Sequence, residues 1–269
     1  MPIHQKSMVY YSQCLNYLNG GTLFMAFIHN ESLNQLITQI QNDANHKYVR
    51  KIIGEAEVPV FFVQVLQWLL GDLAVDKKRA DLYILATTLV KMGTDMHERV
   101  AVASPDSENE QKQQLTVLAG DHYSSLFYWH LAGWHETEGI RCLAGVTCRV
   151  NEWKMSLHSL LHDKKDPDVE KVWFYFEKIA TAWVTALADF FHVEENLKVQ
   201  IAKALVVLYE TTQTADSRLH QHEVWTNELR QRVEFLQEAG RQAGDPFLTF
   251  LIHQLPETDT AVSKASDES

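Results

Sequence analysis

The chain has 269 residues, 46% of them hydrophobic and 22% charged, so it can bury a sizeable core and is not a disordered protein. Glycine (11) and proline (6) are scarce, which argues against sandwiches, barrels and alternating strand–helix folds, because those folds need many turns. The net charge is −11 and no basic stripe occurs, so nucleic acid is not an expected partner.

The N-terminal segment differs from the rest of the chain. Residues 1–24 show no clean hydrophobic period, and the pair Gly20-Gly21 stands just upstream of Met25. Two glycine codons can spell a purine-rich ribosome-binding site, so one hypothesis is that translation starts at Met25 and residues 1–24 are a gene-model extension. A genuine N-terminal arm is the alternative. The segment lacks the basic region and long apolar core of a secretory signal.

Apolar residues recur at helical spacing through most of residues 25–256. The first such stripe, in residues 31–43, contains Leu33, Leu36, Ile37 and Ile40. The same reasoning predicts helices over residues 58–71, 78–93, 111–134, 137–162, 166–191, 194–214 and 217–243. Residues 101–109, which include a Ser-Pro-Asp-Ser sequence, are predicted to form a loop.

Two Asp-Pro pairs predict where helices begin. Asp166-Pro167 and Asp245-Pro246 each place an aspartate N-cap before a proline at the first helical position. The second pair starts a short last helix, and residues 257–269, rich in Thr, Ser, Asp and Glu, are predicted to be a disordered tail. Because no repeat or linker interrupts the pattern, we predict one all-α domain of antiparallel helices.

Location follows from two absences in the sequence. No run of 18 apolar residues occurs, so no membrane span is predicted. Cys14, Cys142 and Cys148 are widely spaced and odd in number, which fits neither a disulfide framework nor a zinc ribbon. The predicted location is therefore the reducing cytoplasm.

The most informative stretch is QLTVLAGDHYS, residues Gln114–Ser124. Together with TLVKMGTDMHERV, Thr88–Val100, it resembles the all-α prenyl diphosphate synthases. In that family a helix ends in an aspartate motif, and a later helix begins with a Leu-Ala-Gly-Asp segment. Asp95 stands where the aspartate motif is expected, and Asp121 ends the Leu-Ala-Gly-Asp segment.

The resemblance becomes closer when QLTVLAGDHYSSLFYWHLA, TDMHERV and NEWKM are taken together. Over residues 32–255 the chain is similar to component I, the small subunit of bacterial two-component heptaprenyl or hexaprenyl diphosphate synthase. The resemblance implies a degenerate isoprenoid-synthase-like bundle that forms a heterodimer with component II. Component II would bind Mg²⁺ and the substrates, and the pair would extend farnesyl diphosphate with isopentenyl diphosphate for the menaquinone side chain.

The chain lacks the charged residues with which catalytic relatives bind metal ions and diphosphate. Ionising an allylic diphosphate requires Mg²⁺ held by several carboxylates. No Asp-Asp pair exists here, and Asp95 and Glu98 leave only two carboxylates, with His97 between them. No arginine lies between Arg99 and Arg141, and no lysine lies where the family's diphosphate-binding lysine would fall, around residues 179–185. A second aspartate motif is also missing near residues 209–220.

We therefore predict no catalytic residue, no metal site and no cofactor bound by this chain, with Asp95, His97 and Glu98 as a vestigial aspartate region. The contact with the partner and the control of product length, to six or seven isoprene units, are assigned to the predicted helix 111–134. The residues assigned to this role are Leu118, Asp121, Tyr123, Phe127 and Trp129.

Several alternatives stay open. The aromatic residues of helices 111–134 and 166–191, among them Trp173, Phe174, Phe176 and Trp183, could simply form the core. Gly120 inside a helix indicates either close approach of a neighbouring helix or a tolerated glycine. His158 and His162 share a helix face but lack further ligands. At the level of function, the rivals are a stand-alone terpene or prenyl synthase that uses Asp95, His97 and Glu98 with Mg²⁺, and a non-catalytic helical adaptor.

Overall fold

The computed structural model describes residues 20–71, 73, 75–100, 107–162, 167–193, 196–213 and 222–255, with side chains from residue 31 onward except at 107–109 and 213. Regular structure in these ranges is entirely helical, which confirms the prediction of a single all-α domain. The helices are α2 (Gly20–Ala44), α3 (Lys47–Ile53), α4 (Val60–Leu70), α5 (Lys77–Glu98), α6 (Ser107–Gly133), α7 (Thr137–His162), α8 (Val169–Phe190), α9 (Leu197–Gln213), α11 (Glu223–Ala243) and α12 (Pro246–His253).

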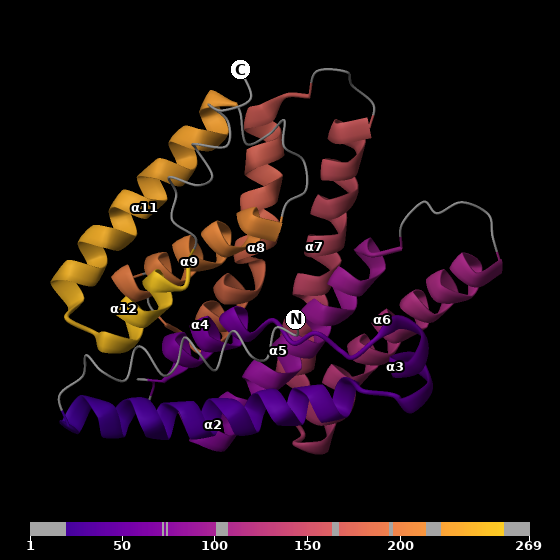
Figure 1. Ribbon diagram of the computed structural model, residues 1–269, viewed down its shortest axis with the longest axis horizontal. Helices are drawn as coiled ribbons and strands as arrows, with labels where there is room; N and C mark the ends of the chain where they lie inside the picture. The colour runs from indigo at the N-terminus through magenta and orange to yellow at the C-terminus, as the bar shows by residue number, and fades with distance from the viewer. Residues whose placement is uncertain are drawn as a thin grey trace.

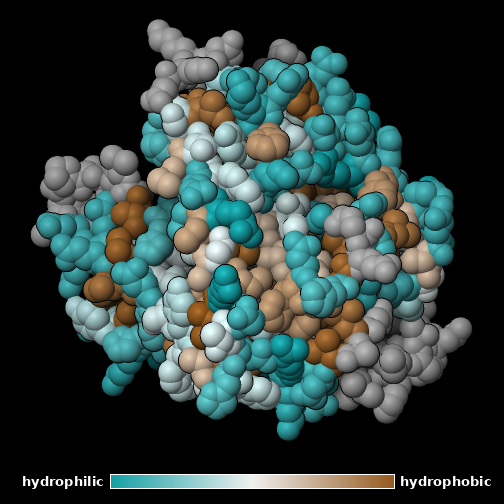
Figure 2. Space-filling view, turned by 180° about the vertical axis from the view of Figure 1, so that it is seen from behind, coloured by the Kyte–Doolittle hydropathy of each residue, from teal (hydrophilic) through white to brown (hydrophobic). Residues whose placement is uncertain are grey.

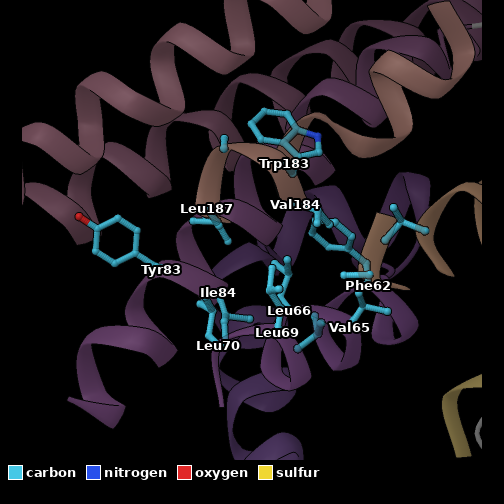
Figure 3. Packing of buried hydrophobic residues seen from close by; sticks show 14 of the residues in the cluster. Phe62, Val65, Leu66, Leu69, Leu70, Tyr83, Ile84, Trp183, Val184 and Leu187 are labelled. Atoms are coloured by element: carbon cyan, nitrogen blue, oxygen red, sulfur yellow. The ribbon is translucent and has the colours of Figure 1, made fainter. Parts of the chain in front are cut away.

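Helix α4 is the centre of the molecule. Every residue from Phe61 to Leu70 is buried, because the helix is apolar except at Gln64 and Gln67, and α2, α5, α9 and α12 pack around it. Figure 3 shows Phe62 and Leu66 of α4 in one cluster with Val184 and Leu187 of α8. In Figure 1, α2 runs along the base, while α7, α8 and α11 rise above the central helices.

Helices α5 and α6 cross at two glycines. A Cβ atom at Gly93 would lie 2.9 Å from the carbonyl oxygen of Gly120, and one at Gly120 would lie 3.1 Å from the carbonyl oxygen of Gly93. These distances leave no room for a methyl group on either backbone. Of the two alternatives left open for Gly120, the structure therefore shows the close approach of a neighbouring helix, which is α5.

A charged corner fixes the turn between α6 and α7. Arg79 of α5 donates to both carboxylate oxygens of Glu136, at 2.6 and 3.0 Å, and the Tyr83 hydroxyl donates to Glu136 at 2.7 Å. These bonds lower the pKa of the Glu136 carboxyl, chiefly through Arg79. The start of α5 is thereby tied to the start of α7.

The helix boundaries test the local predictions. Asp245 caps α12 by accepting from the backbone N–H groups of Phe247 and Leu248, as predicted. The prediction that Asp166 caps the next helix in the same way is wrong: α8 begins at Val169, and its N-cap is Asp168, whose side chain accepts from the N–H of Lys171. Pro167 precedes this cap instead of following it, so the nearer carboxylate satisfies the free amides.

Several terminal and loop predictions fall outside the described residues. Residues 1–19 and 256–269 are not described, so the start at Met25 and the disordered tail stay predictions. Helix α2 begins at Gly20, upstream of Met25. Residues 107–109, predicted as loop, belong instead to α6, and the rest of that predicted loop, residues 101–106, lies outside the described residues. Among the described helices, none has the length and apolar character needed to cross a membrane.

Candidate functional site

The C-terminal half of α5 carries the residues predicted as a vestigial aspartate region. Asp95 accepts a hydrogen bond from the ammonium of Lys91, one turn earlier, at 2.6 Å. The same ammonium lies 3.1 Å from a carboxylate oxygen of Glu210 on α9. Lys91 thus joins carboxylates from two helices, and its side chain is only 9% exposed.

A second lysine reaches this region from α7. The Nζ atom of Lys154 lies 3.0 Å from Glu98 and 3.6 Å from Asp95, and it donates to the carbonyl oxygen of Thr94 at 3.4 Å. Its side chain is 15% exposed. The three carboxylates of the region, on α5 and α9, therefore already have two cations that belong to the chain itself.

The charge state of Lys91 follows from its surroundings. Burial alone would lower the pKa of this ammonium, but the carboxylates of Asp95 and Glu210 outweigh burial and raise it above the ordinary lysine value. Lys91 consequently stays charged across the physiological range. Its ammonium also lies 5.6 Å from the centre of the Phe62 ring, and Phe61 stacks on Tyr209 at 4.7 Å, so side chains fill the adjacent interior.

This arrangement does not fit Mg²⁺ bound by the chain. A divalent ion needs several free oxygen ligands, whereas Asp95, Glu98 and Glu210 are each paired with lysine ammonium groups. In the part of the chain that the structure describes, no three His, Cys, Asp or Glu side chains come together as a metal site. The residues present hold α5, α7 and α9 together through lysine–carboxylate pairs.

His97 turns away from these carboxylates toward α6. Its ring covers Gly120, lying 2.9 Å from the position that a Cβ atom would take there. Its Nε2 atom lies 3.4 Å from the carboxylate of Asp121, which is 66% exposed. The vestigial region predicted as one unit is thus divided: Asp95 and Glu98 pair with internal lysines, and His97 touches the surface of α6.

The outer surface of α6 is unusually apolar. Leu118 is 59% exposed and Trp129 69%, and Val117, Tyr128 and the following Trp134 are exposed as well. We call residues 114, 117, 118, 121, 125, 128, 129 and 132, all exposed and on one side of the helix, the α6 face. Figure 2, in which α6 and α3 lie at the left, shows brown apolar side chains among hydrophilic ones there.

The five residues assigned to the partner contact do not share one environment. Leu118, Asp121 and Trp129 lie on the α6 face, where another chain can touch them. Tyr123 and Phe127 are 4% and 1% exposed and pack into this chain's own core. Burial also raises the pKa of the Tyr123 hydroxyl.

The other sequence candidates are mainly structural. Trp173 and Trp183 are buried, and Phe176 packs with Trp173 and Trp225 in a second, smaller core. Phe174 of α8 is half exposed. The rings of His158 and His162 lie 3.9 Å apart on α7.

Sequence reasoning missed Lys91, Lys154 and Glu210. A lysine four residues before Asp95 is a visible pairing signal on a helix. The reach of Lys154 and Glu210 into the same cluster has no local signature.

Comparison with known proteins gives two matches. Residues 46–238 match the family described as heptaprenyl diphosphate synthase (HEPPP synthase) subunit 1. A relative from Geobacillus stearothermophilus, named heptaprenyl diphosphate synthase component 1, is 34% identical over 110 residues, which are 41% of this chain and 47% of the relative. The match thus spans about half the length of that relative. It supports the resemblance drawn from the Leu-Ala-Gly-Asp helix.

Proposed function

The chain belongs to the heptaprenyl diphosphate synthase subunit 1 family, and we propose that it is the non-catalytic subunit of a heterodimeric long-chain prenyl diphosphate synthase. In this proposal a second subunit with two intact aspartate motifs binds Mg²⁺ and the substrates. The complex extends farnesyl diphosphate with isopentenyl diphosphate to a chain of six or seven isoprene units for menaquinone. The free thiols of Cys142 and Cys148 support a cytoplasmic location.

The observation that carries the proposal is the pairing of every carboxylate in the aspartate region with a lysine. Lys91 pairs with Asp95 and Glu210, and Lys154 pairs with Glu98 and Asp95. This pairing supports the proposal that catalysis depends on another chain. This pairing also counts against a stand-alone synthase that uses Asp95 and Glu98 with Mg²⁺.

The α6 face supplies the surface for that other chain. An exposed apolar area that includes Leu118, Tyr128 and Trp129 on one helix is typical of an interaction site. The face runs from residue 114 to 132, about 27 Å at the helical rise of roughly 1.5 Å per residue. We infer that a helix of the catalytic subunit lies along it.

Product length would then be set from outside this chain. Among the described residues, Phe62, Lys91 and the stacked pair Phe61 and Tyr209 pack in the interior beside Asp95, where a long apolar product would otherwise lie. We infer that the growing chain lies in the catalytic subunit. The α6 face would support the wall of that tunnel, with Tyr123 and Phe127 holding the helix from inside.

The test is an assay with farnesyl diphosphate, labelled isopentenyl diphosphate and Mg²⁺. One reaction contains this chain, one the candidate catalytic subunit encoded in the same genome, and one both. Long-chain product from the mixture alone is the expected result, and its length distinguishes six from seven isoprene units. Product from this chain alone would favour the stand-alone synthase. A mixture no better than the catalytic subunit alone would favour the adaptor.

A further inference from the structure

The α6 face contains a single charge. Between Lys112 and Glu136 the sequence has no Asp, Glu, Lys or Arg except Asp121. Asp121 lies near the middle of the face, between Leu118 and Ser125 along one side of the helix. Its carboxylate is 66% exposed, so the group is hydrated in the isolated chain.

Any chain that covers this face removes water from Asp121. A carboxylate that loses its water without gaining a cation is strongly disfavoured. Within this chain, the Nε2 atom of His97 lies 3.4 Å from the Asp121 carboxylate. An imidazole carries a charge only when it is protonated, whereas lysine and arginine are charged throughout the physiological range. His97 is therefore an incomplete counter-ion once the face is covered.

A second copy of this chain cannot supply the cation that a covered Asp121 carboxylate needs. In a two-fold symmetric contact the same surface is used on both sides, so two Asp121 carboxylates enter one interface. No Lys or Arg occurs from residue 113 to 135 to pair with them. A different chain with a lysine or arginine opposite Asp121 meets no such cost.

We propose that Asp121 is the specificity-determining residue of the α6 face: it pairs with a lysine or arginine of the catalytic subunit and disfavours self-association of this chain. The inference rests on the proposed function, since it names the chemistry that the partner must present. The apolar residues supply affinity, and the one carboxylate excludes the wrong partner by leaving it with an unpaired charge.

The first experiment needs this chain alone. Sedimentation velocity compares the wild type with Asp121→Leu and Ser125→Leu, two substitutions that add an apolar side chain to the same face. Asp121→Leu should self-associate at least tenfold more tightly than Ser125→Leu, which keeps the carboxylate, and the wild type should stay monomeric. Equal self-association of the two variants, or a wild-type dimer through this face, would overturn the proposal. Circular dichroism melts check that both variants are folded.

The second experiment titrates the catalytic subunit. Asp121→Asn should weaken its binding at least tenfold, and Asp121→Lys at least a hundredfold. The control is Glu110→Gln, which removes an exposed carboxylate from the same helix outside the apolar stretch and should change binding less than twofold.

The titration distinguishes failure of the role of Asp121 from failure of the proposed function. If Trp129→Ala weakens binding while Asp121→Asn behaves like Glu110→Gln, the role of Asp121 is refuted and the proposed function stands. If the wild-type chain does not bind the catalytic subunit, the proposed function is refuted.

Discussion

Truncating Trp129 tests the α6 face directly. A tryptophan side chain presents about 250 Å² when fully exposed, so the 69% exposed here leaves about 170 Å² for a partner to cover. At about 25 cal/mol per Å² this area is worth at most about 4 kcal/mol, and hot-spot tryptophans commonly cost about 2–4 kcal/mol on truncation. Trp129→Ala should therefore weaken binding of the catalytic subunit roughly 30- to 700-fold.

The same substitution should hardly change the folding stability of the isolated chain. Trp129 is largely exposed, and its ring makes an edge contact with that of His130, 4.8 Å away between centres, so the loss of stability should be below about 1 kcal/mol. The assay is a calorimetric titration of the catalytic subunit together with a thermal melt of each variant. Phe174→Ala, which removes a half-exposed aromatic side chain on α8, is the control. Binding by Trp129→Ala within threefold of the control would refute the assignment of α6 as the contact.

Three further predictions concern stability. Lys91→Met removes the ammonium that pairs with carboxylates of α5 and α9, and should lower the free energy of unfolding by about 2–3 kcal/mol in urea titrations; a smaller loss than about 0.5 kcal/mol would contradict a structural role for that cluster. Gly93→Ala should lower the free energy of unfolding by about 1–3 kcal/mol, because the new methyl group meets the backbone of Gly120. The control is Gly145→Ala, whose methyl group would meet only the end of the Arg149 side chain, at 3.9 Å, and which should leave stability unchanged or raise it. Glu136 has a lowered pKa in the folded chain, so its contribution is present above the unfolded carboxyl pKa of about 4.3 and is lost as pH falls through the folded value. Glu136→Gln should lower the free energy of unfolding by about 1 kcal/mol at pH 7 and should weaken the fall of stability with decreasing pH. An unchanged pH dependence at acidic pH would show that the Glu136 carboxyl does not contribute to it.

Local patterns in the sequence determined the helical class and most helix positions. The helix predicted over 137–162 is α7, Thr137–His162, and the Asp245-Pro246 start of α12 is present as predicted. Both depend on spacing and capping within a few residues, which sequence records directly. The short α3 and the displaced start of α8 were missed, because seven residues carry little periodicity and two neighbouring aspartates compete for one cap.

Only the tertiary structure showed which side chains of α6 are exposed for a partner and which carboxylates of the aspartate region are paired with lysines. Apolar side chains occur on every side of α6, so its periodicity could not show that Tyr123 and Phe127 point inward while Leu118 and Trp129 point outward. That division depends on where α5 crosses, and the crossing is set by Gly93 against Gly120. The family resemblance showed from sequence alone that the chain lacks the aspartate pairs of catalytic relatives. The pairing of Lys91 with Glu210 required the fold, because charges on distant segments meet only when whole helices pack.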